Sequence, residues 1–207
     1  MNPSTERLAL AGPAGVLQAL RDQPAGASRG VAVVCHPHPL FGGTMDNKVV
    51  QTLARALVQC GWTTLRFNFR GVGTSEGAYG QGIGEAADLH AVVQQCAGSG
   101  PLALAGFSFG AYVTCLEASA IASFRAIEKI VLVGTAVGNF AVPALPPDLH
   151  ERCLVLHGEA DDTVPLAAVL DWARPQTLPV TVVPGCGHFF HGQLPLLKSL
   201  AVRHLSA

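Results

Sequence analysis

The sequence predicts an α/β fold in which helices cover both faces of a mostly parallel sheet. Short apolar runs rich in β-branched residues, such as residues 31–35 and 180–183, alternate with longer segments whose apolar residues recur at helical spacing. The strand-like runs are apolar throughout, as expected for strands that are buried on both faces. Strands and helices that alternate along a chain in this way are typical of a parallel sheet with crossover helices.

The first half of the chain begins with an expected hairpin and then follows the alternation of strands and helices. Residues 7–10 and 16–20 flank the turn-like residues 11–13 and predict an antiparallel hairpin. The loop after residues 31–35 contains two prolines and two glycines, which exclude regular structure. Asp46 or Asn47 then caps a helix that runs to about Cys60. We expect the next elements to be a strand over 62–69, a loop over 70–77 and a helix over 84–96.

The second half continues the alternation. We expect a strand over 101–105, a helix over 110–123, a strand over 130–133, an irregular section over 134–147, a strand over 153–156, a helix from Pro165 to about 174–175, a strand over 180–183 and a helix over 194–205.

Composition limits the classes of protein. The 207 residues suit one domain over 1–207, and 49% hydrophobic against 13% charged residues indicate a compact core rather than disorder. A net charge of -1 with no basic face argues against nucleic acid or an anionic membrane as partner. The start of the chain lacks a basic signal-peptide region, and glycine and proline interrupt the longest apolar stretch, 130–145. We therefore expect a cytoplasmic protein. Its six scattered cysteines are expected to be buried free thiols.

The stretch Gly106-Phe107-Ser108-Phe109-Gly110 lies between a predicted strand and a predicted helix. Gly-x-Ser-x-Gly in that position is the pattern of a nucleophile elbow, in which a tight turn projects the serine hydroxyl above the sheet. The two glycines allow strand and helix to approach closely. A five-residue pattern also arises by chance as a plain turn, so other residues must support this interpretation.

Two later loops supply that support. A serine nucleophile needs a base, and the base needs a group that orients it. Asp161 follows the strand over 153–156, and His188 follows the strand over 180–183. The chain order is therefore serine, carboxylate, histidine, as expected for a nucleophile elbow in this fold class. Asp162 is the second choice for the carboxylate, with a helix cap as its expected role.

These residues resemble those of small α/β-hydrolases, in particular serine esterases and dienelactone-hydrolase-like proteins. The resemblance extends from about residue 31 to the last helix. The resemblance rests on a His-Gly-x-x-Asp-x-x-Val-Pro motif and a Gly-His motif, formed here by His157, Gly158, Asp161, Val164, Pro165, Gly187 and His188. Dienelactone hydrolases usually have a cysteine nucleophile, whereas this chain has Ser108, so dienelactone is not expected as the substrate.

The resemblance implies a role for each residue. Ser108 would attack an acyl carbonyl, His188 would move the proton and Asp161 would hold the imidazole. The backbone N–H of Phe109 would be one oxyanion-hole donor. The second would come from residues 36–43, where prolines cannot donate; Leu40 is our choice and Phe41 the alternative.

Other signals near these loops are weaker. His36 and His38, with His188 and His191, suggest a metal cluster, but no carboxylate or cysteine completes a known ligand spacing, so no metal is expected. The glycines of 71–77 have the wrong spacing for a dinucleotide site. The arginines at 66 and 70 are expected to hold their loop through backbone carbonyls.

Five phenylalanines flank the site segments, at positions 41, 107, 109, 189 and 190. Core packing explains them equally well, but we expect Phe41 and Phe189 to line an apolar acyl pocket.

The expected function is a serine hydrolase that cleaves small or accessible carboxylic esters without a cofactor. We expect a small-molecule ester as its substrate, and neither nucleic acid nor a membrane as a partner. Residues 134–152 are too few for a lid domain, so we expect an α/β-hydrolase fold with an open site, unlike a true lipase. A thioesterase, a peptidase or an acyltransferase would use the same triad. A non-catalytic binding module would not need an intact triad. The sequence leaves the oligomeric state open.

Overall fold

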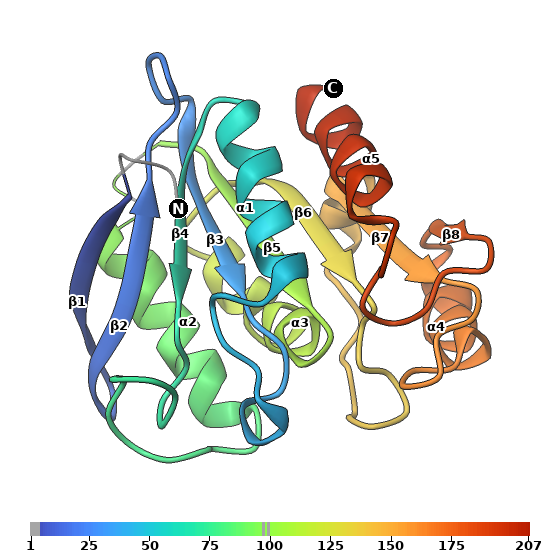
Figure 1. The fold of residues 1–207 in the computed structure, drawn as a ribbon, viewed down its shortest axis with the longest axis horizontal. Helices are drawn as coiled ribbons and strands as arrows, with labels where there is room; N and C mark the ends of the chain where they lie inside the picture. Colours follow the sequence, from blue (N-terminus) through green and yellow to red (C-terminus); the bar gives the residue numbers. More distant parts are fainter. Residues whose placement is uncertain (1–4, 97, 99) are drawn as a thin grey trace.

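The computed structural model describes residues 5–96, 98 and 100–207, which form one eight-stranded sheet in the order β1-β2-β4-β3-β5-β6-β7-β8 (Figure 1). The strands are β1 (Glu6–Gly12), β2 (Gly15–Asp22), β3 (Gly30–Cys35), β4 (Trp62–Phe67), β5 (Leu102–Phe107), β6 (Ile127–Val133), β7 (Cys153–Gly158) and β8 (Val180–Val183). The helices are α1 (Lys48–Gln59), α2 (Ile83–Cys96), α3 (Phe109–Ala122), α4 (Leu166–Ala173) and α5 (Leu194–Ser206).

Strands β1 and β2 form the predicted antiparallel hairpin, and β2 pairs antiparallel with β4. All pairs from β4 to β8 are parallel. This confirms the α/β-hydrolase fold with its N-terminal antiparallel pair. Strand order 4-3-5 places β5, which leads into Ser108, in the middle of the sheet.

The helices bury the sheet between two apolar layers. One core cluster joins the strands to α1 and α5, with Leu53 and Leu197 fully buried. The other joins the opposite face to α2, α3 and α4, with Leu89 and Val113 fully buried. Because both faces of these strands are buried, their residues are apolar at consecutive positions.

The parallel register brings the carboxyl ends of the strands to one edge, at the bottom of Figure 1. Cys35 pairs with Gly106, Phe107 with Val133, and Gly158 with Val183. Ligand sites of open α/β sheets lie outside this edge. The loops after β3, β5, β7 and β8 therefore meet where the candidate residues lie.

Several element boundaries differ from the sequence prediction. Strand β4 ends at Phe67 because Phe69 donates its N–H to His36 Nε2 instead of to a strand. Strand β7 continues to Gly158, which pairs with Val183. Asn47, one of the two expected caps, caps α1 by accepting from the Val49 N–H at 2.9 Å. The expected cap at Asp162 is wrong, because α4 begins after Pro165 without a side-chain cap.

All six cysteines are free thiols, as predicted, but only Cys35, Cys115 and Cys186 are buried, and the other three are half-buried. Burial raises the pKa of Cys35 and of Cys153 to about 12, which leaves both thiols protonated and unreactive at neutral pH. Within the part of the chain that the structure describes, none of the helices has the length and apolarity to span a membrane.

Candidate active site

Ser108 lies in a tight turn between β5 and α3, with φ of 57° and ψ of -117°. A non-glycine residue adopts this conformation only when its surroundings enforce it. A Cβ on Gly106 would lie 2.4 Å from the carbonyl oxygen of Gly110, and one on Gly110 would lie 2.3 Å from that of Cys35. The two glycines of the motif are therefore required by the close approach of strand, turn and helix.

A chain of hydrogen bonds links the three side chains expected to be catalytic. Ser108 Oγ lies 3.0 Å from His188 Nε2, and His188 Nδ1 lies 2.7 Å from Asp161 Oδ2. All three residues are buried. The three come from loops after β5, β7 and β8, which the sheet edge brings together.

Asp161 is held on both of its oxygens. Oδ1 accepts hydrogen bonds from the N–H groups of Thr163 and Val164, at 2.9 and 2.7 Å. Burial favours a raised pKa, but the bonds from His188 and the Val164 N–H outweigh it and lower the pKa of Asp161. The carboxylate therefore stays ionised beside the imidazole. Asp162 is exposed and bonds only to the hydroxyl of Thr163 among the described residues, so the geometry favours Asp161 over it.

His157 supports Asp161 from within the sheet. Its Nε2 lies 2.9 Å from the carbonyl of Val164 and 3.5 Å from Asp161 Oδ2. Burial lowers the pKa of His157, so the imidazole is neutral and its Nε2–H is directed at these two oxygens. The histidine that begins the His-Gly-x-x-Asp motif thus fixes the turn that carries Asp161.

His36 fixes the loop after β3 in a similar way. Its Nδ1 lies 2.6 Å from the carbonyl of Pro37, and its Nε2 accepts the Phe69 N–H at 3.0 Å. This pair of bonds requires a neutral ring that is protonated on Nδ1. Burial lowers the pKa of His36 to about 4. The role is structural, as the sequence suggested for residues 36–43.

The backbone N–H groups expected to bind an oxyanion differ in whether they already donate a hydrogen bond. Among the described residues, none accepts a hydrogen bond from the Phe109 N–H, which opens α3. The Leu40 N–H instead donates to His38 Nδ1 at 3.2 Å, and the Phe41 N–H donates to the His38 carbonyl at 3.1 Å. One of these two must change partner before it can meet an oxyanion.

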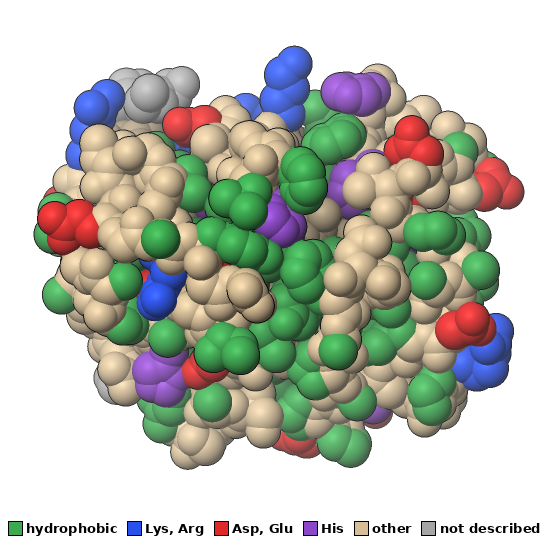
Figure 2. Space-filling view, turned by 90° about the horizontal axis from the view of Figure 1, so that it is seen from below, with side chains coloured by type: hydrophobic (Ala, Val, Ile, Leu, Met, Phe, Trp, Pro, Cys, Tyr) green, Lys and Arg blue, Asp and Glu red, His purple; other side chains and the backbone are tan. Residues whose placement is uncertain are grey.

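The five phenylalanines divide into two groups. Three are fully buried, at positions 107, 109 and 190. Phe41 is 87% exposed and Phe189 is 44% exposed, and each packs against a histidine, His38 and His188 respectively. Figure 2 looks at the carboxyl edge of the sheet and shows hydrophobic side chains gathered around histidines in the middle of this face.

Two features of the site were missed from the sequence. Gly134, the first residue after β6, has φ of 54°, and a Cβ on it would lie 3.1 Å from His188 Cε1. Phe140, from the section after β6, stacks on Tyr112 and also contacts His38 and Phe109. The only signal for Gly134 was its place at a strand end, and Phe140 gave none because its contacts are distant in sequence.

The remaining signals resolve as structure. No group of three or more His, Cys, Asp or Glu side chains among the described residues gathers as a metal site. Arg66 donates to the Met45 carbonyl, as expected of it, although that carbonyl lies outside the 70–77 loop. Arg70 forms an ion pair with the buried Asp88 of α2 at 2.7 Å, and its side chain bonds to no backbone carbonyl of the described residues.

Comparison with known proteins identifies the family of the chain. A family model described as serine aminopeptidase, S33, matches residues 26–149, and the chain belongs to this family of hydrolases. An uncharacterized protein of Rickettsia prowazekii (strain Madrid E) is 31% identical over 194 residues, which are 86% of this chain and 79% of the relative.

Two solved structures extend the similarity over almost the whole chain. A Xanthomonas campestris protein, described as an α/β serine hydrolase without a lid, has a TM-score of 0.88 and 36% identity, covering 99% of this chain and 95% of its own. An α/β serine hydrolase homologue from Coxiella burnetii has a TM-score of 0.84 and 39% identity, covering 97% of each chain. The chain is therefore a small α/β serine hydrolase without a lid domain.

We predict that Gly134→Ala lowers kcat at least tenfold, with little change in KM, for hydrolysis of the substrate that the protein turns over. The new methyl group would press on the His188 imidazole and shift it from both of its hydrogen-bond partners. Gly138→Ala is the matched control, because Gly138 also has positive φ but its Cβ would meet only Ala168, at 3.7 Å. Equal losses in the two variants would show that backbone strain, not the contact with His188, causes the effect.

We predict that protonation of His36 destabilises the fold in acid. Its pKa is about 4 in the folded protein against 6.5 in the unfolded chain, so the unfolded chain takes up the proton first. The stability from the neutral ring is complete above pH 6.5 and declines as pH falls toward 4, by about 3 kcal/mol. Urea unfolding from pH 8 to 4 should show a shallower decline for His36→Gln than for the unmodified protein. His191→Gln, at an exposed position, should keep the full slope; the same slope in His36→Gln would refute this assignment.

Proposed function

We propose that the protein hydrolyses carboxylic esters of small or accessible acyl groups through an acyl-enzyme on Ser108. The observation that carries this proposal is the unbroken hydrogen-bond chain from Ser108 through His188 to Asp161 at the carboxyl edge of the sheet. A hydroxyl becomes a competent nucleophile when a base accepts its proton, and an oriented carboxylate stabilises the resulting imidazolium.

The proposed reaction has two halves. Ser108 Oγ attacks the carbonyl carbon while its proton passes to His188 Nε2, which then protonates the leaving alcohol. Water then loses a proton to the same nitrogen and attacks the acyl carbon. The bond from this carbon to Ser108 Oγ breaks, Oγ takes the proton back from His188, and the acid is released. Nucleophile, base and orienting acid are all side chains of this chain, so the proposed chemistry requires no cofactor or metal.

The oxyanion formed in each half needs two donors. We assign one to the Phe109 N–H, for which the described residues offer no other acceptor. We assign the second to the Leu40 N–H, whose 3.2 Å bond to His38 Nδ1 is long enough to be exchanged for a charged acceptor.

An ester is favoured as substrate by the surface around the site. Leu40, Phe41 and Phe189 are large apolar side chains that stay exposed on the site loops, which suits acyl or alkyl groups. We propose that Phe41 and Phe189 line the acyl side of the open site.

Peptidase activity is the second candidate, because the matching family model is described as a serine aminopeptidase. Thioesterase and acyltransferase reactions would use the same three side chains. A non-catalytic binding role has less support, since it would not require the hydrogen-bonded serine, histidine and aspartate.

We predict that Ser108→Ala lowers kcat/KM for p-nitrophenyl acetate and butyrate by about 10³-fold or more. Ser119→Ala, at an exposed position on the same helix, should retain full activity. Circular dichroism should show that both variants are folded. Full activity in folded Ser108→Ala would place the nucleophile elsewhere, and turnover of amino-acid p-nitroanilides in preference to esters would favour the peptidase alternative.

We predict that Phe41→Ala raises KM for p-nitrophenyl octanoate roughly fivefold and leaves KM for the acetate almost unchanged. Loss of a partly covered aromatic contact costs about 1 kcal/mol with a long acyl chain, and acetate does not reach it. Phe124→Ala controls for loss of an exposed phenylalanine, since Phe124 is 42% exposed beyond the far end of α3. Equal effects of Phe41→Ala on all chain lengths would contradict the acyl-pocket assignment.

A further inference from the structure

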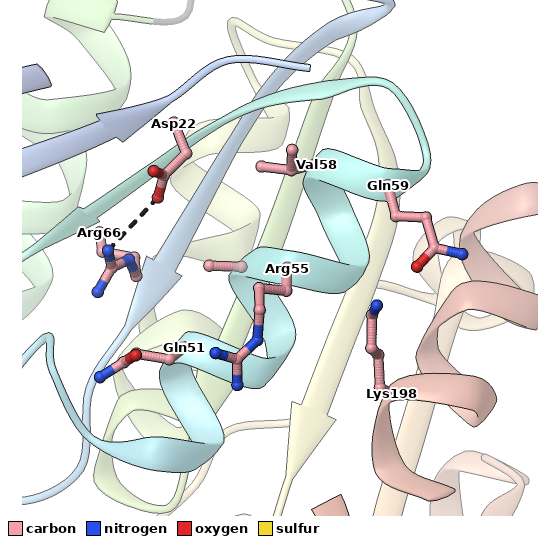
Figure 3. Close-up of a pocket in the computed structure, with 8 residues that line it drawn as sticks. Asp22, Gln51, Arg55, Val58, Gln59, Arg66 and Lys198 are labelled. Carbon is pink, nitrogen blue, oxygen red and sulfur yellow. Dashed lines mark hydrogen bonds and ion pairs between the residues drawn. The ribbon is translucent and has the colours of Figure 1, made fainter. Parts of the chain in front are cut away.

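A cavity of about 430 Å³ lies beside α1, away from the loops of the candidate active site. Its wall is formed by one side of α1, by strands β2 and β4 and by α5. Figure 3 shows the lining side chains spread along α1, with Arg66 beside Asp22 at one end and Lys198 near Gln59 at the other. The lining includes none of Ser108, Asp161 and His188.

The lining is rich in positive charge. Arg55 of α1, Arg66 of β4 and Lys198 of α5 line it together with a single carboxylate, that of Asp22. Arg66 NH2 lies 3.4 Å from Asp22 Oδ2, the pair that is joined by a dashed line in Figure 3. Asp46 also contacts Arg66, but its side chain is 57% exposed and does not line the cavity. Arg55 and Lys198 have no carboxylate partner among the described residues.

Arg66 carries an unmet hydrogen-bonding requirement. Its side chain is only 6% exposed, and its Nε is buried without a hydrogen-bond partner among the described residues. A buried donor without a partner costs about 1–3 kcal/mol, and more when it is charged. Because Nε is itself buried, it is not open to the cavity, and an anion that enters the cavity would instead meet the charges of Arg55 and Lys198.

The shape and chemistry of the cavity define the ligand class. Its volume is in the range of small-molecule pockets and leaves room for an organic group besides an anionic head. Guanidinium groups bind carboxylate and phosphate oxygens through paired N–H donors. Gln51 and Gln59 supply amide groups, and Ala54 and Val58 supply apolar wall.

We propose that this cavity is a second binding site, which takes a small organic anion with a phosphate or carboxylate head. The head lies among Arg55, Arg66 and Lys198, and the organic part lies along Ala54 and Val58. The site is separate from the hydrolytic centre, so it does not depend on the proposed esterase activity.

The test is an NMR titration of the arginine Nε–H signals with phenyl phosphate and, separately, with 3-phenylpropionate. Saturable shifts of the Arg66 and Arg55 signals are expected with one or both anions, and the stronger binder identifies the head group. Phenol and 3-phenylpropanol, which lack the charge, should give no saturable shift. Absence of saturation with both anions would overturn the proposal.

Variants separate this site from general charge attraction. Arg55→Gln and Lys198→Gln should each weaken binding at least tenfold. Arg203→Gln removes the same charge from an exposed position on α5 and should leave binding unchanged. An equal loss in Arg203→Gln would show that net charge alone attracts the anions and would overturn the proposal.

A labelled protein separates this site from the hydrolytic centre. Protein whose serine has reacted with a fluorophosphonate should bind the anion with unchanged affinity. If Ser108 does not react, a titration of Ser108→Ala gives the same comparison. Loss of binding in either form would place the anion at the serine and contradict a second site.

Discussion

Ser108 occupies a backbone conformation that costs a non-glycine residue about 1–3 kcal/mol, and the rest of the structure serves to enforce it. Strand β5 lies in the middle of the sheet, so packing on both faces holds the turn. Gly106 and Gly110 let the strand, the turn and α3 approach within distances that a Cβ would prevent. The turn in return directs the hydroxyl at His188, and the Phe109 N–H finds no acceptor among the described residues.

Neutral histidines hold the two loops that face this turn. His36 links the loop after β3 to the end of β4, and His157 links the ends of the turn that carries Asp161. Both rings are buried, and burial lowers the pKa of each. They therefore act as fixed hydrogen-bond groups at neutral pH, while the ionised Asp161 provides the one charge that the proposed mechanism requires. Preorganised groups of this kind need no rearrangement during the reaction.

Local patterns predicted the fold and the three candidate catalytic side chains because each is encoded within a short segment. Apolar runs defined the strands, and motifs at strand ends defined Ser108, Asp161 and His188. The contribution of Gly134 and Phe140 was not predictable, since it depends on packing against His188 and His38 across the sheet edge. The α1 cavity was also missed, because its three cations come from three separate elements. The bond from the Leu40 N–H to His38 depends on loop geometry that the two prolines constrain but do not specify.

The most direct test of Ser108 as an activated nucleophile is intact-protein mass spectrometry after reaction with a fluorophosphonate, followed by peptide mapping. We predict one adduct per chain, on Ser108, and no adduct after His188→Ala at the same exposure. A folded protein that acquires no adduct, or one that is modified at another residue, would contradict the assignment of Ser108 as an activated nucleophile.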